Sequence, residues 1–284
     1  MTVWADMDVV AVDRAGGRFR TSISDAWTLV EVPQGGIVAA IAARTMAVAL
    51  DRPEQRLRSL TAVFAGKVAG GPVEIDVGIL RRGRSMSQLT ATVRNPGSSA
   101  GLTAVAVFGT ARKGFEFTEL AMPTVPGPDG LPSFRDPVPD GVDFEFSSPP
   151  MPFWDEIIEA RPVFGRPPWE PHEEGPAQNV LWYRIDDPPL MDDGRLDPLA
   201  TLVVCDTMPS AVTQKVGPEE GWFGPSADFT IHLLNPARPG WLVAHNQARY
   251  AGDGYASVDL ALWDPTGPTL VAYATQMMFF AFGV

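Results

Sequence analysis

Two runs of the chain are apolar on every helical face, and each precedes segments in which apolar and polar residues alternate. The first run, "GGIVAAIAARTMAVAL" (Gly35–Leu50), consists of good helix formers and is interrupted only by Arg44. The second, "LDPLATLVVCDTMPSAV" (Leu196–Val212), has the same character. A helix that is apolar all round is one that is surrounded by protein. We therefore expect two buried helices, at 35–50 and 196–212.

Four β-rich segments follow each expected helix. Turn sequences such as "GGP", "GRS" and "NPGSSAG" separate the first set. Strands joined by such short turns are antiparallel. A sheet wrapped round a helix is the simplest way to bury it, so the pattern predicts an α+β fold in which this unit occurs twice. The expected strands are 59–68, 72–82, 85–94 and 102–111, then 226–234, 240–250, 255–264 and 269–280.

The two units are separated by a segment rich in proline. Residues 118–179 include "MPTVPGPDGLPSFRDPVPDG" and "GRPPWEPHEEGP", compositions typical of linkers and loops. Within them "FWDEIIEARPVF" is expected to form a strand. We predict an N-terminal half at 1–117, a proline-rich linker at 118–147 and a C-terminal half at 148–284.

The charge of the chain excludes several partners. Its 284 residues include 22 Lys and Arg against 34 Asp and Glu, a net charge of −12, so nucleic acid and anionic membranes would repel it. The start, "MTVWADMDVV", lacks the regions of a signal peptide, and no apolar run reaches about 18 residues. One cysteine and three histidines leave little material for a disulfide or a metal site. We expect a cytoplasmic protein with no metal or other cofactor.

Several segments, taken in order, resemble the double-hotdog acyl-coenzyme A thioesterases such as bacterial acyl-coenzyme A thioesterase II. They are "QGGIVAA" and "LRRGRSMS" in the first half, then "ADFTIHL", "WLVAHNQARYAGDG" and "LWDPTGPTLVAYATQ" in the second. The resemblance covers nearly the whole chain and is weakest in the proline-rich middle. It implies a double-hotdog fold, an acyl-coenzyme A substrate and a site at which an Asp, a Gln and a Ser or Thr activate water.

Comparing the two halves suggests which residues carry chemistry. Gln276 interrupts an apolar strand and falls on Phe108 when the halves are superposed, while Asp228 falls on Thr61. An unpaired buried amide costs about 1–3 kcal/mol, which makes packing alone a poor reason for Gln276. We therefore expect Asp228 and Gln276 to form the catalytic pair.

The first helix is expected to contribute its N-terminus to the same site. It opens with "Gln34-Gly35-Gly36", where no hydroxyl or carboxylate stands at the cap position, whereas an Asp and a Pro open the second helix. We expect the N–H groups of Gly35 and Gly36 to be open to a substrate oxygen and to lie near Asp228 or Gln276. Each glycine also fits an ordinary tight turn before a helix.

The remaining candidates follow from the resemblance and from local charge. An ungapped fit places Arg249 where the family has a hydroxyl, and Gln247 is the nearest neutral polar residue on that strand face. The basic hairpin residues Arg82 and Arg84 are candidates for binding the phosphates of the acyl carrier, or are surface residues of a turn. His245 is a further candidate near the site.

Two other functions stay open. The arginine at the hydroxyl position favours a non-catalytic acyl or acyl-coenzyme A binder. A hotdog enoyl-coenzyme A hydratase is the third alternative, although "Leu234-Asn235-Pro236-Ala237" lacks the histidine expected after its Asn-Pro. The apolar C-terminal strand at 269–284 needs a cover, which suggests a homodimer.

Overall fold

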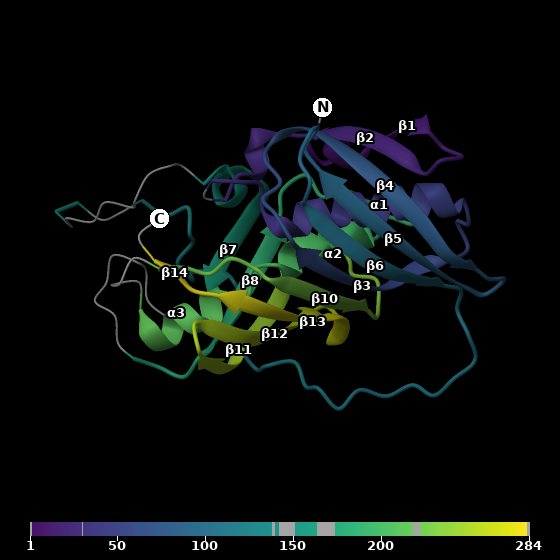
Figure 1. The fold of residues 1–284 in the computed structure, drawn as a ribbon. Helices are drawn as coiled ribbons and strands as arrows, with labels where there is room; N and C mark the ends of the chain where they lie inside the picture. The colour runs from purple at the N-terminus through teal and green to yellow at the C-terminus, as the bar shows by residue number, and fades with distance from the viewer. Residues whose placement is uncertain are drawn as a thin grey trace.

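The structure is a computed structural model that describes residues 2–29, 31–137, 140–141, 151–163, 174–217 and 222–282. Its main feature is a twelve-stranded antiparallel sheet with the order β1-β2-β4-β5-β6-β3-β10-β13-β12-β11-β8-β7. Two further short strands, β9 (Trp222–Phe223) and β14 (Ala281–Phe282), pair separately near the C-terminus. Figure 1 shows the two longest helices side by side among the strands.

The N-terminal part of the sheet surrounds one long helix. Helix α1 spans Gly35–Leu50, as the sequence predicts, and most of its residues are buried. Two short 3-10 helices, η1 (Val3–Met7) and η2 (Asp25–Trp27), precede it. The strands are β1 (Val10–Asp13), β2 (Arg18–Ile23), β3 (Arg56–Phe64), β4 (Gly71–Arg82), β5 (Met86–Arg94) and β6 (Leu102–Gly109).

The C-terminal part differs from the prediction in its helix. The expected single helix at 196–212 is wrong, because two short helices, α2 (Pro198–Cys205) and α3 (Ser210–Val216), occupy the region. Pro209 explains the break: it has no N–H to continue the helix and it disfavours helical geometry at the residue before it. The strands are β7 (Ile158–Pro162), β8 (Gln178–Ile185), β10 (Asp228–Leu233), β11 (Trp241–Gly252), β12 (Tyr255–Asp264) and β13 (Thr269–Phe279).

The two parts share one topology. Each has a strand, a helix and four more strands along the chain, and from the centre outward the sheet runs β3-β6-β5-β4-β2 on one side and β10-β13-β12-β11-β8 on the other. They meet where β3 pairs with β10, and at this junction Thr61 lies opposite Thr230. Thr61 and Thr230 thus mark an approximate two-fold axis. The domain boundaries at 117 and 148 stay a prediction.

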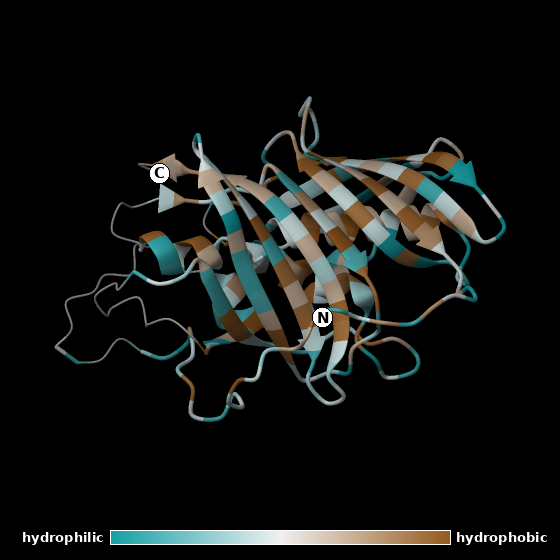
Figure 2. Cartoon of the chain, turned by 90° about the horizontal axis from the view of Figure 1, so that it is seen from below, coloured by the Kyte–Doolittle hydropathy of each residue, from teal (hydrophilic) through white to brown (hydrophobic). Residues whose placement is uncertain are grey.

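Burial alternates along the strands as a half-buried sheet requires. In β5 the pattern is strict, with Ser87, Leu89, Ala91 and Val93 facing inward. Figure 2 shows the corresponding alternation of apolar and polar bands along the ribbons.

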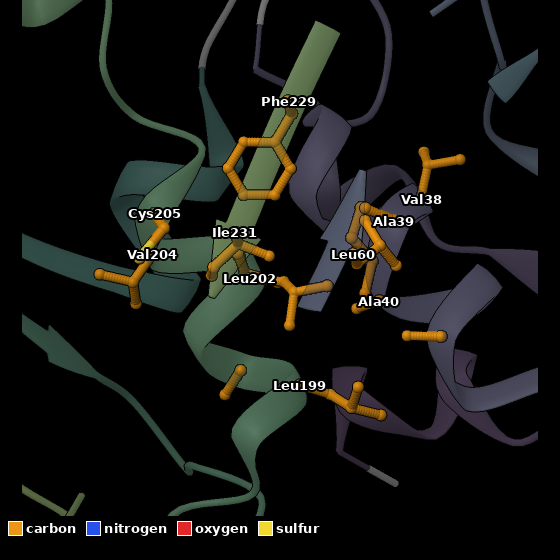
Figure 3. Close-up of a cluster of buried hydrophobic side chains, with 14 of the residues drawn as sticks. Val38, Ala39, Ala40, Leu60, Leu199, Leu202, Val204, Cys205, Phe229 and Ile231 are labelled. Carbon is orange, nitrogen blue, oxygen red and sulfur yellow. The ribbon is translucent and has the colours of Figure 1, made fainter. Parts of the chain in front are cut away.

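Helices α1 and α2 pack against each other in the middle of the molecule. Side chains of both helices and of both central strands fill one core there, among them Ala39 and Leu202 from the helices and Leu60 and Ile231 from the strands (Figure 3). The junction between the halves is therefore part of a continuous hydrophobic core and not a solvent-filled boundary.

The region after the linker differs in part from the prediction. The expected strand at 153–164 begins as a π-helical turn, η3 (Phe153–Ile157), and becomes a strand only at β7. Within the described ranges no helix has the length and hydropathy needed to cross a bilayer.

Candidate functional site

The N-terminus of α1 is closed by side chains and is not open as we expected. Gln34 is the cap residue, and its Oε1 accepts a hydrogen bond from the Ile37 N–H at 3.1 Å. The Gly36 N–H donates to the carboxylate of Asp206. Among the described residues the Gly35 N–H has no partner, and Gly35 is only half-buried. One of the two expected donors, Gly35, therefore stays available to a ligand.

Asp206 reaches this position because α2 ends directly before it. Its own N–H still bonds to the Leu202 carbonyl at 3.2 Å, but its backbone leaves the helical region at φ −89° and ψ 48°. The side chain is thereby turned from the end of α2 toward the start of α1. A carboxylate is stabilised at a helix N-terminus, where N–H groups and the positive end of the dipole meet it.

Three polar side chains form a chain of hydrogen bonds beside the helix end. The Gln276 Nε2 donates to the Ser226 Oγ, and Ser226 donates to the Asp206 Oδ1 at 3.3 Å. Gln276 is 2% exposed, and its Oε1 has no hydrogen-bond partner in the part of the chain that the structure describes. An unpaired buried carbonyl oxygen is a costly feature, so this atom marks a position for a ligand or a water.

An irregularity in strand pairing directs Ser226 inward. Thr230 pairs with Thr275, which would place position 226 opposite the partly exposed Phe279, yet Ser226 bridges to Met278. One residue of register is therefore gained between Ser226 and Thr230. A one-residue slip reverses which face a side chain occupies. Ser226 consequently shares the inner face with Gln276.

The surroundings of Asp206 set its protonation. Burial raises the pKa of its carboxyl to about 7, while the hydrogen bonds from the Gly36 N–H and from Ser226 act in the opposite direction. A carboxyl with a pKa near neutrality is suited to accept and return a proton in the physiological range.

Both glycines at the start of α1 permit close approach. A Cβ on Gly35 would lie 2.8 Å from the Asp206 Oδ2 and 2.7 Å from the Phe64 ring. A Cβ on Gly36 would lie 2.7 Å from the Leu202 carbonyl oxygen of α2. These glycines are therefore required by contacts across the two halves, and not only by the turn before the helix.

The structure separates Asp228 from Gln276. Asp228 alternates with Phe229, which is fully buried, so its side chain lies on the outer face of the sheet. There its Oδ1 accepts the Met277 N–H at 2.9 Å. The expected pair of Asp228 and Gln276 is thus wrong as geometry, and Asp206 is the carboxylate beside Gln276.

Gln247 and Arg249 also lie on the outer face. Asn246, their fully buried neighbour, points inward to the Met208 carbonyl, so Gln247 points away from the site. Gln247 bonds to Gln178 and to Arg249, and Arg249 forms an ion pair with Asp259. His245 lies on the same outer face, where burial lowers its pKa.

The basic hairpin is distant from the helix end. Arg82 donates to the Ala49 carbonyl near the C-terminus of α1 at 3.2 Å. Thirteen residues of α1 separate Ala49 from Gly36, which is about 20 Å along the axis. Arg84 is exposed in the same hairpin. The structure does not bring either arginine to the polar chain, and their role toward a carrier stays a prediction.

No group of three or more His, Cys, Asp or Glu able to hold a metal ion is found in the described ranges. His172 lies outside those ranges. The polar chain uses neither thiol nor imidazole, and the chemistry available to it is that of a carboxylate, a hydroxyl, an amide and a backbone N–H.

Comparison with known proteins agrees with this architecture. Residues 23–109 match the model of the acyl-CoA thioesterase N-terminal domain and residues 128–280 that of the acyl-CoA thioesterase C-terminal domain. No curated protein matches the chain. The chain belongs to the acyl-CoA thioesterase family.

Solved structures show the same fold. A conserved hot dog fold protein of unknown function from Alicyclobacillus acidocaldarius is 25% identical, with a TM-score of 0.78 and 100% of both chains covered. The acyl-CoA thioesterase II TesB2 of Mycobacterium marinum is 23% identical, with a TM-score of 0.75 and 99% of both chains covered. These matches confirm the predicted double-hotdog α+β fold.

Proposed function

We propose that the protein hydrolyses acyl-coenzyme A thioesters with a water molecule activated by Asp206, Ser226 and Gln276. The observation that carries the proposal is the hydrogen-bonded chain of these three side chains at the N-terminus of α1. It contains the Asp, the Gln and the Ser or Thr that the family resemblance implies. Family membership supports thioester hydrolysis in general, and the acyl-coenzyme A substrate is our inference from it.

Each polar group has a role in this reaction. A water placed between Asp206 and Gln276 donates one hydrogen to the carboxylate and the other to the unpaired Gln276 Oε1. Its lone pair then faces the thioester carbonyl carbon. Ser226 holds the carboxylate and the amide in line by bonding to both. Two acceptors that fix both hydrogens of a water orient its attack.

The reaction then proceeds in two steps. The water oxygen bonds to the carbonyl carbon as its proton passes to Asp206, and the negative carbonyl oxygen accepts the free Gly35 N–H. Electrostatic stabilisation of this oxygen is the usual role of helix N–H donors in acyl transfer. When the intermediate collapses, the C–S bond breaks and the sulfur takes the proton from Asp206, releasing free acid and coenzyme A.

The binder alternative rested on the absence of a hydroxyl from the expected position. Ser226 fills that role from another part of the chain, so Arg249 no longer argues against hydrolysis. No feature of the described residues favours the hydratase.

A pair of matched variants tests the proposal. Purified protein is incubated with a panel of acyl-coenzyme A esters and a reagent for free thiols. We expect thiol release by the wild type, a loss of about 10²- to 10³-fold in Asp206→Asn, and nearly wild-type rates in Asp228→Asn. Both changes replace a carboxylate by an amide, but on opposite faces of the sheet. Equal losses in both variants, or no thiol release by the wild type, would contradict the proposal.

A further inference from the structure

One buried amide joins the two helix ends that form the site. Gln34 is 2% exposed. Its Oε1 accepts from the Ile37 N–H in the first turn of α1, while its Nε2 donates to the Val203 carbonyl at 3.0 Å and to the Asp206 carbonyl at 2.8 Å. The same side chain therefore caps the N-terminus of α1 and the C-terminus of α2.

This arrangement is unusual because helix ends are normally closed by residues near them in the chain or by water. Here the last carbonyls of α2 are closed from the other half of the molecule, by a residue 172 positions away. The Asp206 carboxylate meets the Gly36 N–H only while α1 and α2 keep their present offset. The bonds of Gln34 act directly on that offset.

The segment after α2 is held from its other side by the C-terminal half. Asn246 donates to the Met208 carbonyl and to the Ser210 Oγ, both at 3.0 Å, and Tyr183 bonds to Thr207 at 3.0 Å. These contacts fix the segment to its own sheet. The amide of Gln34 is the side chain that ties this segment's backbone to the N-terminal half among the described residues.

We propose that Gln34 is a positioning residue, which holds the Asp206 carboxylate against the Gly36 N–H so that it is aligned for the attacking water. The inference rests on the proposed function and adds a residue that does not touch the substrate. An amide is required because the side chain must accept at one helix end and donate at the other. A glutamate would place a second acceptor against the α2 carbonyls.

Gln34→Asn separates the two roles of the side chain. Asparagine is a good N-cap residue, so it can still close α1, but it is one methylene too short to reach α2 as well. Gln55 provides a matched control: it is 4% exposed and donates to the carbonyls of Gly83 and Arg84 at the far end of α1. Both variants lose bonds from a buried amide to backbone carbonyls, but only one of them lies at the site.

We expect Gln34→Asn to lower kcat by roughly 10- to 100-fold, the effect of a small misplacement of a catalytic group, with KM within about 2-fold. Gln55→Asn should melt lower as well and keep a nearly wild-type kcat. A wild-type kcat in Gln34→Asn, or an equal loss in Gln55→Asn, would overturn the proposal.

A second readout does not depend on activity. Carboxyl NMR of protein labelled with 13C-aspartate follows the titration of Asp206, whose signal is identified by its loss in Asp206→Asn. The pKa of Asp206 should rise further in Gln34→Asn because the Gly36 N–H moves away from the carboxylate. If thiol release by the wild type fails, only the proposed function is lost. An Asp206 titration identical in the wild type and in Gln34→Asn would by itself overturn the positioning role.

Discussion

At the scale of single residues, the amide of Gln276 separates a catalytic from a structural role. Its only hydrogen bond within the described ranges is to Ser226, which still has Asp206 as a partner. Gln276→Leu should therefore leave stability within about 1 kcal/mol of wild type, since the strand is otherwise apolar. Because the water loses one acceptor, turnover should fall by roughly 10²-fold. Chemical denaturation and thiol release on the same sample check both expectations, and a destabilised variant with full activity would refute them.

Asp206 predicts two pH dependences of opposite sign. As a base it must be ionised, so kcat/KM should rise with pH through about pH 7, where its pKa lies. Its folded-state pKa is above the unfolded value, so between about pH 4 and pH 7 the folded protein binds more protons. Stability from this group therefore falls as pH rises through that window, by an amount on the order of a few kcal/mol.

The Asp206→Asn variant is the control for this linkage. It removes the titrating group, so the difference in unfolding free energy between pH 5 and pH 8 should shrink relative to the wild type. Urea denaturation at the two pH values measures that difference. An unchanged pH dependence of stability would show that Asp206 ionises as freely in the folded chain as in the unfolded one.

The residue that sequence reasoning found was the one with a local signal. Gln276 stands out as an amide in an apolar strand, and it does lie at the polar chain. Asp206 has no such signal, because it lies inside a run that reads as one continuous helix. Ser226 precedes its strand, and only the change of register after it turns it inward. Asp228 was chosen in their place because strand alternation alone does not say which face is the inner one.

At the scale of elements, the start of α1 is defined by contacts that the sequence does not display. The two glycines are expected from the sequence, but what each would strike comes from α2 and β3, on other parts of the chain. The break between α2 and α3 is the decisive event, since a continuous helix over 196–212 would carry Asp206 past the end of α1. Pro209 was visible in the sequence and was the signal for that break.

Alanine substitutions at the two glycines should have different effects. In Gly36→Ala the new Cβ meets backbone atoms of Leu202 and Val203, which cannot move independently, so we expect a loss of about 1–3 kcal/mol in stability. In Gly35→Ala the Cβ meets the side chains of Phe64 and Asp206, which can shift. Activity should then fall more than stability. Thermal melts and turnover for both variants test this, and an active Gly35→Ala would remove the glycine from the site.

At the scale of the whole molecule, the internal symmetry reveals what became of a second site. Thr61 and Thr230 are equivalent about the axis and pair with Val105 and Thr275, so the next residues, Ala106 and Gln276, are equivalent too. The superposition on Phe108 was therefore two residues out of register, although both positions are buried and apolar. The duplicated half thus has an alanine where the polar chain has its amide.

The helix ends show the same difference. Just as the start of α1 meets Asp206 of α2, the start of α2 meets Arg44 of α1: the Arg44 guanidinium pairs with the Asp197 carboxylate at 2.6 Å. Asp197 also caps α2 by accepting the Leu199 N–H at 2.9 Å. A carboxylate held by an arginine and by its own helix is not available as a base. We therefore infer one hydrolytic site in each chain.

This inference makes the two helix junctions separable by mutation. Arg44→Leu removes a partly buried ion pair, which should cost about 1–3 kcal/mol of stability, while Asp197 keeps its capping bond. Turnover should stay near the wild-type value because the junction at Gly35 and Asp206 is untouched. Asp206→Asn should behave in the opposite way, losing turnover while the fold is kept. Unfolding free energy and kcat measured on both variants decide the matter: if Arg44→Leu lowers kcat as far as Asp206→Asn does, both junctions carry chemistry and the single-site interpretation is wrong.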